Sequence, residues 1–129
     1  MKVLVGGKFN VIHPGHVFFL RKARSRGDTL TVVLAHDRTP GIVVPARERK
    51  KVLASLRCVD KVVIGYPITG EAGYLRVIRD ERPGIIALGY DQHVDIHALE
   101  ERIKKLGLRV RIVRIPELKG YATRTLIKK

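Results

Sequence analysis

Two histidines, His13 and His16, flank a Pro-Gly pair early in the chain, shortly after the adjacent Gly6 and Gly7. Imidazole N–H groups donate hydrogen bonds to anions, and Lys8 adds a full positive charge between the two pairs. Glycine lets a ligand approach the backbone, and a helix starting beside His13 would add unpaired N–H groups and a positive dipole end. Phosphate is the ligand that this combination predicts.

The elements that must position these groups begin with strands. Short, continuously apolar runs rich in β-branched residues recur along the chain, each too short for a helix. Such runs are typical of strands that are buried on both faces of a sheet. They lie at residues 3–5, 30–35, 62–64 and 85–88, and a fifth strand, at first alternating apolar residues with arginine, is expected at 108–115.

Amphipathic segments separate the strands. In the first of them, apolar residues recur at the i, i+3, i+4, i+7 spacing of one helix face, and Gly27 offers a left-handed cap at its end. Asp95 is expected to cap the start of the last of these segments. The segments predict helices at residues 14–26, 46–56, 71–81 and 95–107, with a short C-terminal helix from residue 122.

Because strand and helix alternate, the chain is predicted to form one α/β domain over residues 1–129, a Rossmann-like three-layer α/β/α fold. Its sheet should have five parallel strands in the order 3-2-1-4-5, and ligands would bind where that order reverses, between strands one and four. The loops there are residues 6–14 and 89–94. They contain the only asparagine, Asn10, and the only glutamine, Gln92.

Composition limits the classes of partner. The chain has 26 Lys and Arg against 12 Asp and Glu, a net charge of +14, which favours anionic partners. The basic residues are scattered without interleaved aromatics, so a nucleic-acid partner is not expected. The single cysteine, Cys58, excludes an internal disulfide, and no residue spacing suggests a protein-held metal. His36 and His97 are expected to be structural or solvent-facing.

No apolar run approaches the roughly 18 residues of a membrane span, so a cytoplasmic protein without a membrane partner is expected. The scarcity of Asn and Gln is typical of proteins from heat-loving sources.

The first loop resembles the mark of the cytidylyltransferase-like nucleotidyltransferases, which is Gly-x-Phe-Asp followed by His-x-Gly-His in the first strand-to-helix turn. The resemblance extends along almost the whole chain. The segments that carry it are Gly7-Lys8-Phe9-Asn10, His13-Pro14-Gly15-His16, Pro45 with Arg47, Glu48 and Arg49, Cys58-Val59-Asp60, Gly89-Tyr90-Asp91-Gln92, and Gly120-Tyr121-Ala122-Thr123-Arg124.

This family joins a nucleoside monophosphate to a phosphorylated acceptor and releases pyrophosphate, with Mg²⁺ bridging the nucleotide phosphates. The resemblance therefore implies ATP or CTP as a substrate, and it also implies a homodimer. The catalytic residues that it implies are His13, His16, Lys8 and Arg124. The nucleotide-binding residues that it implies are Gly6, Gly7, Lys8, Phe9, Asn10, His13, Gly15, His16, Gly89, Asp91, Gln92, Tyr121, Thr123 and Arg124. The acceptor-binding residues that it implies are Asp37 and Arg49.

Three positions depart from the usual residues of the family. Lys8 replaces a Thr, Asn10 replaces an Asp, and Ala122-Thr123-Arg124 replaces Ser-Thr-Thr. Lys8 and Arg124 raise the positive charge near the phosphates, where Arg124 would act as a bidentate clamp. Asn10 removes a carboxylate that would repel phosphate or hold a metal.

The loop 88–92 most resembles that of the archaeal FAD synthases, small members of the family that adenylylate FMN, so FMN is the favoured acceptor. The tyrosines that would stack on its ring are Tyr66, Tyr74, Tyr90 and Tyr121. Alternatives are a glycerol-3-phosphate or other alcohol-phosphate cytidylyltransferase and a sugar-phosphate nucleotidyltransferase. A catalytically silent nucleotide- or RNA-binding module is an alternative of another class.

Overall fold

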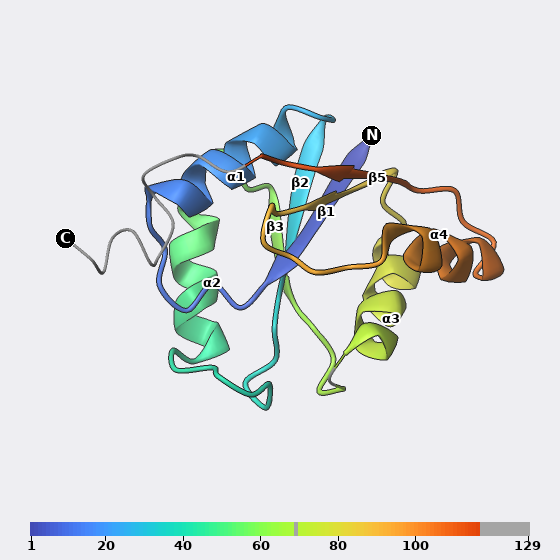
Figure 1. Cartoon of the computed structure of the whole chain (residues 1–129). Coiled ribbons are helices and arrows are strands. Elements are labelled where there is room, and N and C mark those ends of the chain that lie inside the picture. The colour runs from blue at the N-terminus through green and yellow to red at the C-terminus, as the bar shows by residue number, and fades with distance from the viewer. Residues whose placement is uncertain (69, 117–129) are drawn as a thin grey trace.

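A computed structural model describes residues 1–68 and 70–116 (Figure 1). The described strands form one parallel sheet in the order β3-β2-β1-β4-β5, which confirms the predicted topology. The strands are β1 Lys2–Gly7, β2 Thr29–Leu34, β3 Lys61–Ile64, β4 Ile85–Leu88 and β5 Arg111–Arg114.

The helices cover both faces of this sheet. Helices α1 and α2 lie on one face and α3 and α4 on the other, as the three-layer prediction requires (Figure 1). The helices are α1 Pro14–Arg24, α2 Ala46–Ala54, α3 Glu71–Glu81 and α4 Ile96–Lys105. The C-terminal helix predicted from residue 122 lies outside the described residues.

Helices α1, α2 and α4 and strand β5 are shorter than predicted. Strand β5 begins at Arg111 and not at residue 108, because the N–H of Leu108 donates to the carbonyl oxygen of Ile103 and so terminates α4 (3.4 Å). The N–H of Arg111 instead bonds to the carbonyl oxygen of Gly84 beside β4 (3.0 Å). Asp95 caps α4 as predicted, since its Oδ1 accepts from the N–H of Ala98 (3.1 Å).

Successive residues of β1 point into two separate cores. Val3 and Val5 belong to the apolar cluster under α1 and α2, whereas Leu4 belongs to the cluster under α3 and α4. All three side chains are fully buried. A strand that is buried on both faces has no room for alternation with polar residues, which explains the continuous apolar run in its sequence.

Strands β1 and β4 separate at their carboxyl ends. Their register pairs Val3 with Ile85 and Leu4 with Ile86, whereas β1 pairs with β2 along its full length to Gly7. The reversal of strand order therefore opens a space beyond Leu4, which is the position where ligands bind in open parallel sheets.

No helix in the described part of the chain is both long and apolar enough to cross a membrane.

Gly73→Ala is expected to destabilise the fold by about 1–2 kcal/mol, because overpacking outweighs the helix propensity that alanine adds. A Cβ at Gly73 would lie 2.4 Å from the backbone oxygen of Ile68, so α3 or the loop before it must shift. Urea denaturation measures the free energy of unfolding. Gly84→Ala is the matched control, because its Cβ would meet the flexible side chain of Met1, which can move away. Wild-type stability in Gly73→Ala would contradict the close packing of this loop on α3.

Candidate active site

The first turn of α1 is closed by its two histidines. The Nδ1 of His13, the N-cap residue, accepts a hydrogen bond from the backbone N–H of Gly15 (3.0 Å). The Nδ1 of His16 accepts from the backbone N–H of His13 (3.1 Å), so the two side chains form a reciprocal capping box. Histidines replace the Ser or Thr and Glu that usually form this motif.

These hydrogen bonds fix the tautomers of both rings. A ring nitrogen that accepts from a backbone N–H carries no proton, so the proton of each neutral imidazole must be on Nε2. The two rings lie against each other, with centroids 3.9 Å apart, and both residues are half-buried. Two adjacent Nε2–H donors are therefore fixed at a helix N-terminus whose first turn holds no acidic residue. An anion is the natural acceptor for them.

His16 remains neutral well below physiological pH. Burial lowers its pKa from 6.5 to about 4, and the nearby imidazole of His13 acts in the same direction. The charge of Asp91, in the loop after β4, partly opposes this shift. A neutral ring can donate a hydrogen bond to a ligand but contributes no full charge.

Phe9, which has a strained backbone conformation, packs beside the histidine pair. Phe9 has a φ of 49° and is buried, and its ring lies beside His16 at a centroid distance of 5.6 Å. A Cβ at Gly7 would lie 2.9 Å from Cε2 of Phe9, so only glycine leaves room for this ring. Gly7 is thus required by packing within the protein, a reason that differs from the ligand approach expected from sequence.

Asn10 joins two loops. Its Nδ2 donates to the carbonyl oxygen of Gly41 (2.8 Å), and its Oδ1 accepts from the N–H of Val43 (2.9 Å). An Asp at this position would lose the first of these bonds, because a carboxylate has no donor. The replacement of the usual Asp therefore has a structural reason, and the side-chain amide of Asn10 faces the loop 38–44.

Arg49 supports the same loops from the interior. Its side chain is fully buried and donates to the carbonyl oxygens of Val44 (2.7 Å) and Lys8 (2.8 Å) and to the carboxylate of Asp37 (3.0 Å). The expectation that Arg49 contacts the acceptor directly is corrected, because its guanidinium is closed off from any ligand. Asp37 is 53% exposed, and the backbone N–H of Ala46, with Arg49, holds the pKa of its carboxyl below the usual value.

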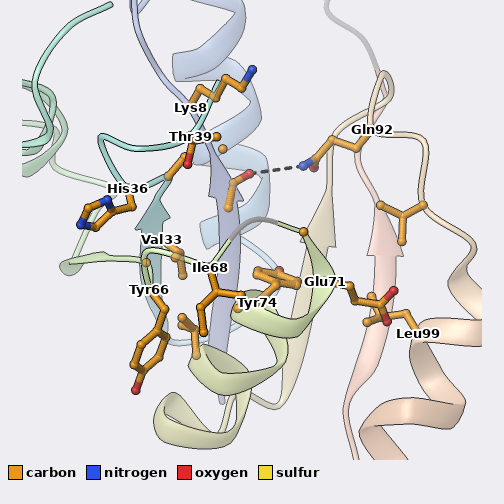
Figure 2. A pocket seen from close by; sticks show the side chains of 18 of the residues that line it. Lys8, Val33, His36, Thr39, Tyr66, Ile68, Glu71, Tyr74, Gln92 and Leu99 are labelled. Carbon is orange, nitrogen blue, oxygen red and sulfur yellow. Dashed lines mark hydrogen bonds between the residues drawn. The ribbon is translucent and has the colours of Figure 1, made fainter. Parts of the chain in front are cut away.

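The loop after β4 is held from both sides. Gln92 accepts from the N–H of Gly89 (2.7 Å) and donates to the carbonyl oxygen of Gly6 (3.3 Å), so it spans the gap between β4 and β1 (Figure 2). Arg114, at the end of β5, donates to the carbonyl oxygens of Gly89 (2.9 Å) and Gln92 (2.8 Å). Sequence reasoning missed Arg114, although its place at the end of the last strand is a signal for such a role.

A cavity of about 490 Å³ opens between these loops and helices α3 and α4 (Figure 2). One wall carries the polar side chains of Lys8, His36 and Thr39, and the Nδ1 of His36 accepts from the N–H of Arg38 (3.1 Å). His36 therefore lines a site, where sequence reasoning expected a structural or solvent-facing role. Most of the remaining wall is apolar or aromatic, and its side chains include Val33, Tyr66, Ile68, Tyr74, Val77, Leu88, Val94 and Leu99.

The structure thus brings together most of the residues predicted from sequence. Both predicted loops lie at the carboxyl ends of β1 and β4, and Gly6, Gly7, Lys8 and Gln92 line the cavity. His13 and His16 are not among the residues that line this cavity; they lie at the start of α1, and the loop before α1 contributes Lys8 to the cavity wall. Tyr121, Thr123 and Arg124 lie outside the described residues.

His16→Gln is expected to flatten the dependence of stability on pH between about pH 6.5 and pH 4. In the wild type, unfolded His16 takes up a proton near its ordinary pKa of 6.5, whereas folded His16 does so only near 4. The stability that neutral His16 contributes is therefore fully present above about pH 6.5 and is lost as the pH falls from there toward 4. Glutamine does not titrate, so urea denaturation at several pH values should give a shallower slope. His97→Gln, at an exposed position on α4, should keep the wild-type slope, and equal slopes in all three proteins would contradict the buried, neutral state of His16.

Comparison with known proteins agrees with this geometry. The chain is 43% identical over 125 residues to the FAD synthase of Pyrococcus abyssi, covering 92% of this chain and 82% of the relative. It is 39% identical over 134 residues to the FAD synthase of Methanosarcina mazei, covering 98% and 86% of the two chains. The resemblance to archaeal FAD synthases that was noted in the sequence is therefore confirmed.

A solved structure supports the fold over the same span. A lipopolysaccharide core biosynthesis protein from Thermoplasma volcanium superimposes with a TM-score of 0.83 at 32% identity, covering 92% of this chain and 98% of that chain. The family model described as cytidylyltransferase-like matches residues 4–126, which include both loops of the site. The chain belongs to the cytidylyltransferase-like family.

Proposed function

We propose that this protein is an FMN adenylyltransferase, an FAD synthase that transfers AMP from ATP to FMN and releases pyrophosphate. The observation that carries the proposal is the two-part site, in which the loop that leads to a pair of fixed imidazole donors also places Lys8 in the wall of a largely apolar cavity. The donors suit a triphosphate, and the cavity suits a flat ring that carries a phosphate. The relatives named FAD synthase support this pair of substrates.

The reaction requires positioning more than acid–base chemistry. A phosphate oxygen of FMN attacks the α-phosphorus of ATP, and the bond from that phosphorus to the bridging oxygen of the β-phosphate breaks. The attacking oxygen is already anionic, so no strong general base is needed. Nε2–H donors of His13 and His16 and the N-terminus of α1 would hold the phosphate oxygens on which negative charge increases.

Lys8 is placed to serve both substrates. Its side chain lines the cavity and extends over Gly41, where an added Cβ would lie 2.9 Å from Nζ. The ammonium would therefore stand between the acceptor phosphate in the cavity and the triphosphate at the start of α1. Neutralising two approaching phosphate groups at this point lowers their mutual repulsion.

We expect Mg²⁺ to bind to the protein together with the nucleotide. Among the described residues, no group of three or more His, Cys, Asp or Glu side chains could hold a metal ion, and Asn10 replaces the family's usual Asp. These residues fit an ion that is bound mainly by phosphate oxygens and water, as Mg²⁺ commonly is. Bound in this way, the ion would neutralise charge on the triphosphate.

The cavity favours FMN over smaller acceptors. Glycerol 3-phosphate and choline phosphate would leave much of a cavity of about 490 Å³ unfilled and would bury little of its apolar surface. A sugar phosphate is the second candidate, because one similar structure is described as a lipopolysaccharide core biosynthesis protein. Glu71, Gln92, Asp95 and Arg102 in the lining could pair with some hydroxyls of such a sugar, but the apolar and aromatic part of the wall would leave others without a partner.

An activity screen tests the function directly. The purified protein is incubated with Mg²⁺, ATP or CTP, and FMN, glycerol 3-phosphate, phosphocholine or heptose 1-phosphate, and pyrophosphate release is measured. FAD, identified by chromatography, is expected from ATP with FMN. Turnover only with CTP would overturn the choice of nucleotide, and turnover only with a non-flavin phosphate would overturn the choice of acceptor. No turnover with any pair, together with RNA binding that weakens steeply with salt, would overturn the enzymatic proposal.

His16→Ala is expected to lower kcat by roughly 100-fold or more, the usual effect of removing one preorganised donor from a developing negative charge. Steady-state kinetics with ATP and FMN measure this, and circular dichroism checks the fold. The control is His97→Ala, at an exposed position on α4 that should leave kcat unchanged. A normal kcat in His16→Ala would remove this imidazole from the chemistry.

A further inference from the structure

Two tyrosines line the cavity, and their hydroxyl groups are used differently. Tyr66 lies in the loop between β3 and α3, and its hydroxyl donates to the carboxylate of Asp80 on α3. Figure 2 shows its hydroxyl end directed away from Lys8 and Gln92. Tyr74 is on α3 itself, and the same view shows it between Ile68 and Glu71. The hydroxyl of Tyr66 is therefore already occupied within the protein.

The hydroxyl of Tyr74 has no hydrogen-bond partner among residues 1–68 and 70–116. In this part of the chain no fully buried side-chain nitrogen or oxygen lacks such a partner, so the unpaired oxygen of Tyr74 must be accessible. The residue is only partly exposed and lines the cavity, so the cavity is the place where a ligand would meet this side chain. A polar atom left unpaired in a mostly apolar cavity costs free energy unless a ligand pairs with it.

Packing fixes the position of this hydroxyl. A Cβ at Gly6 would lie 3.2 Å from Cε1 and 3.9 Å from Cδ1 of Tyr74, so the ring edge lies against the carboxyl end of β1. The ring also packs on the apolar cluster beneath α3 and α4. Burial raises the pKa of the Tyr74 phenol well above its usual range, so the group remains an O–H donor at any working pH. A fixed donor at the floor of the cavity is suited to select one kind of ligand.

We propose that the hydroxyl of Tyr74 donates a hydrogen bond to a ring nitrogen or ring carbonyl oxygen of the acceptor and so determines specificity for a planar heterocycle. This inference rests on the proposed function, since it names the part of FMN that the cavity recognises. Aliphatic phosphates, which have no heterocyclic ring, would leave the hydroxyl unpaired. A site that is built to pair a polar group discriminates strongly against ligands that cannot pair it.

Tyr74→Phe is the direct test, because it keeps the ring and removes only the hydroxyl. The KM for FMN is expected to rise about threefold to tenfold, the usual effect of losing one neutral hydrogen bond, while the KM for ATP stays unchanged. His97→Ala is the control, because His97 is exposed on α4 and does not line the cavity, and its KM for FMN should match the wild type. Equal KM values for FMN in the two variants and the wild type would overturn the proposal.

Flavin analogues test the same contact in the wild-type protein, and so cover the case in which Tyr74→Phe does not fold. The acceptors are FMN, 1-deaza-FMN and 5-deaza-FMN, in which a ring nitrogen becomes C–H, and the 2-thio and 4-thio forms. At least one of these changes should raise the wild-type KM, and Tyr74→Phe should not discriminate against that analogue. Equal KM values for all five acceptors in the wild type would overturn the proposal.

Different results would contradict the proposed activity and the proposed role of Tyr74. If the wild-type protein forms no FAD from ATP and FMN, the proposed function fails. If it forms FAD and the KM of Tyr74→Phe for FMN equals that of the wild type and of His97→Ala, the function stands and the role of Tyr74 fails.

Discussion

The site depends on two hydrogen bonds in the first turn of α1, where each histidine accepts a backbone N–H through Nδ1. This arrangement satisfies helix N–H groups and determines which ring nitrogen carries the proton. It leaves both Nε2–H groups directed away from the helix backbone as donors. The same bonds therefore stabilise the helix and prepare it to bind an anion. A Ser or Thr cap would satisfy the helix but would present no comparable donor.

The rest of the architecture supplies the space around this donor pair. Because β1 and β4 cease to pair after Leu4 and Ile86, a gap opens at the centre of the sheet, and Gln92 bridges it with its side-chain amide. Arg49 and Asn10 hold the neighbouring loops in place. The result is a polar site at the start of α1 next to an apolar cavity on the other side of β1. A reaction between a triphosphate and a phosphate attached to a large ring needs both compartments.

Sequence patterns predicted the elements and their order well, because burial on both faces of a parallel sheet leaves a clear apolar signature in each strand. The two ligand loops followed from the topology alone. Spacing could not reveal that Arg49 is buried or that Asn10 binds loop 38–44, because their partners include residues more than 30 positions away in the chain. The role of Tyr74 was equally hidden, since it depends on packing against Gly6. For β5, a hydrogen bond to the end of α4 overrode the apolar pattern.

The most direct test of the account is ¹⁵N NMR of the imidazole rings at neutral pH, with the spectra assigned by comparison with His13→Gln and His16→Gln. Both Nδ1 atoms are expected to be unprotonated, with the ring proton on Nε2, and both Nε2 signals are expected to shift when a non-hydrolysable ATP analogue and Mg²⁺ are added. A proton on Nδ1 of either ring, or Nε2 signals that ignore the nucleotide, would contradict the account.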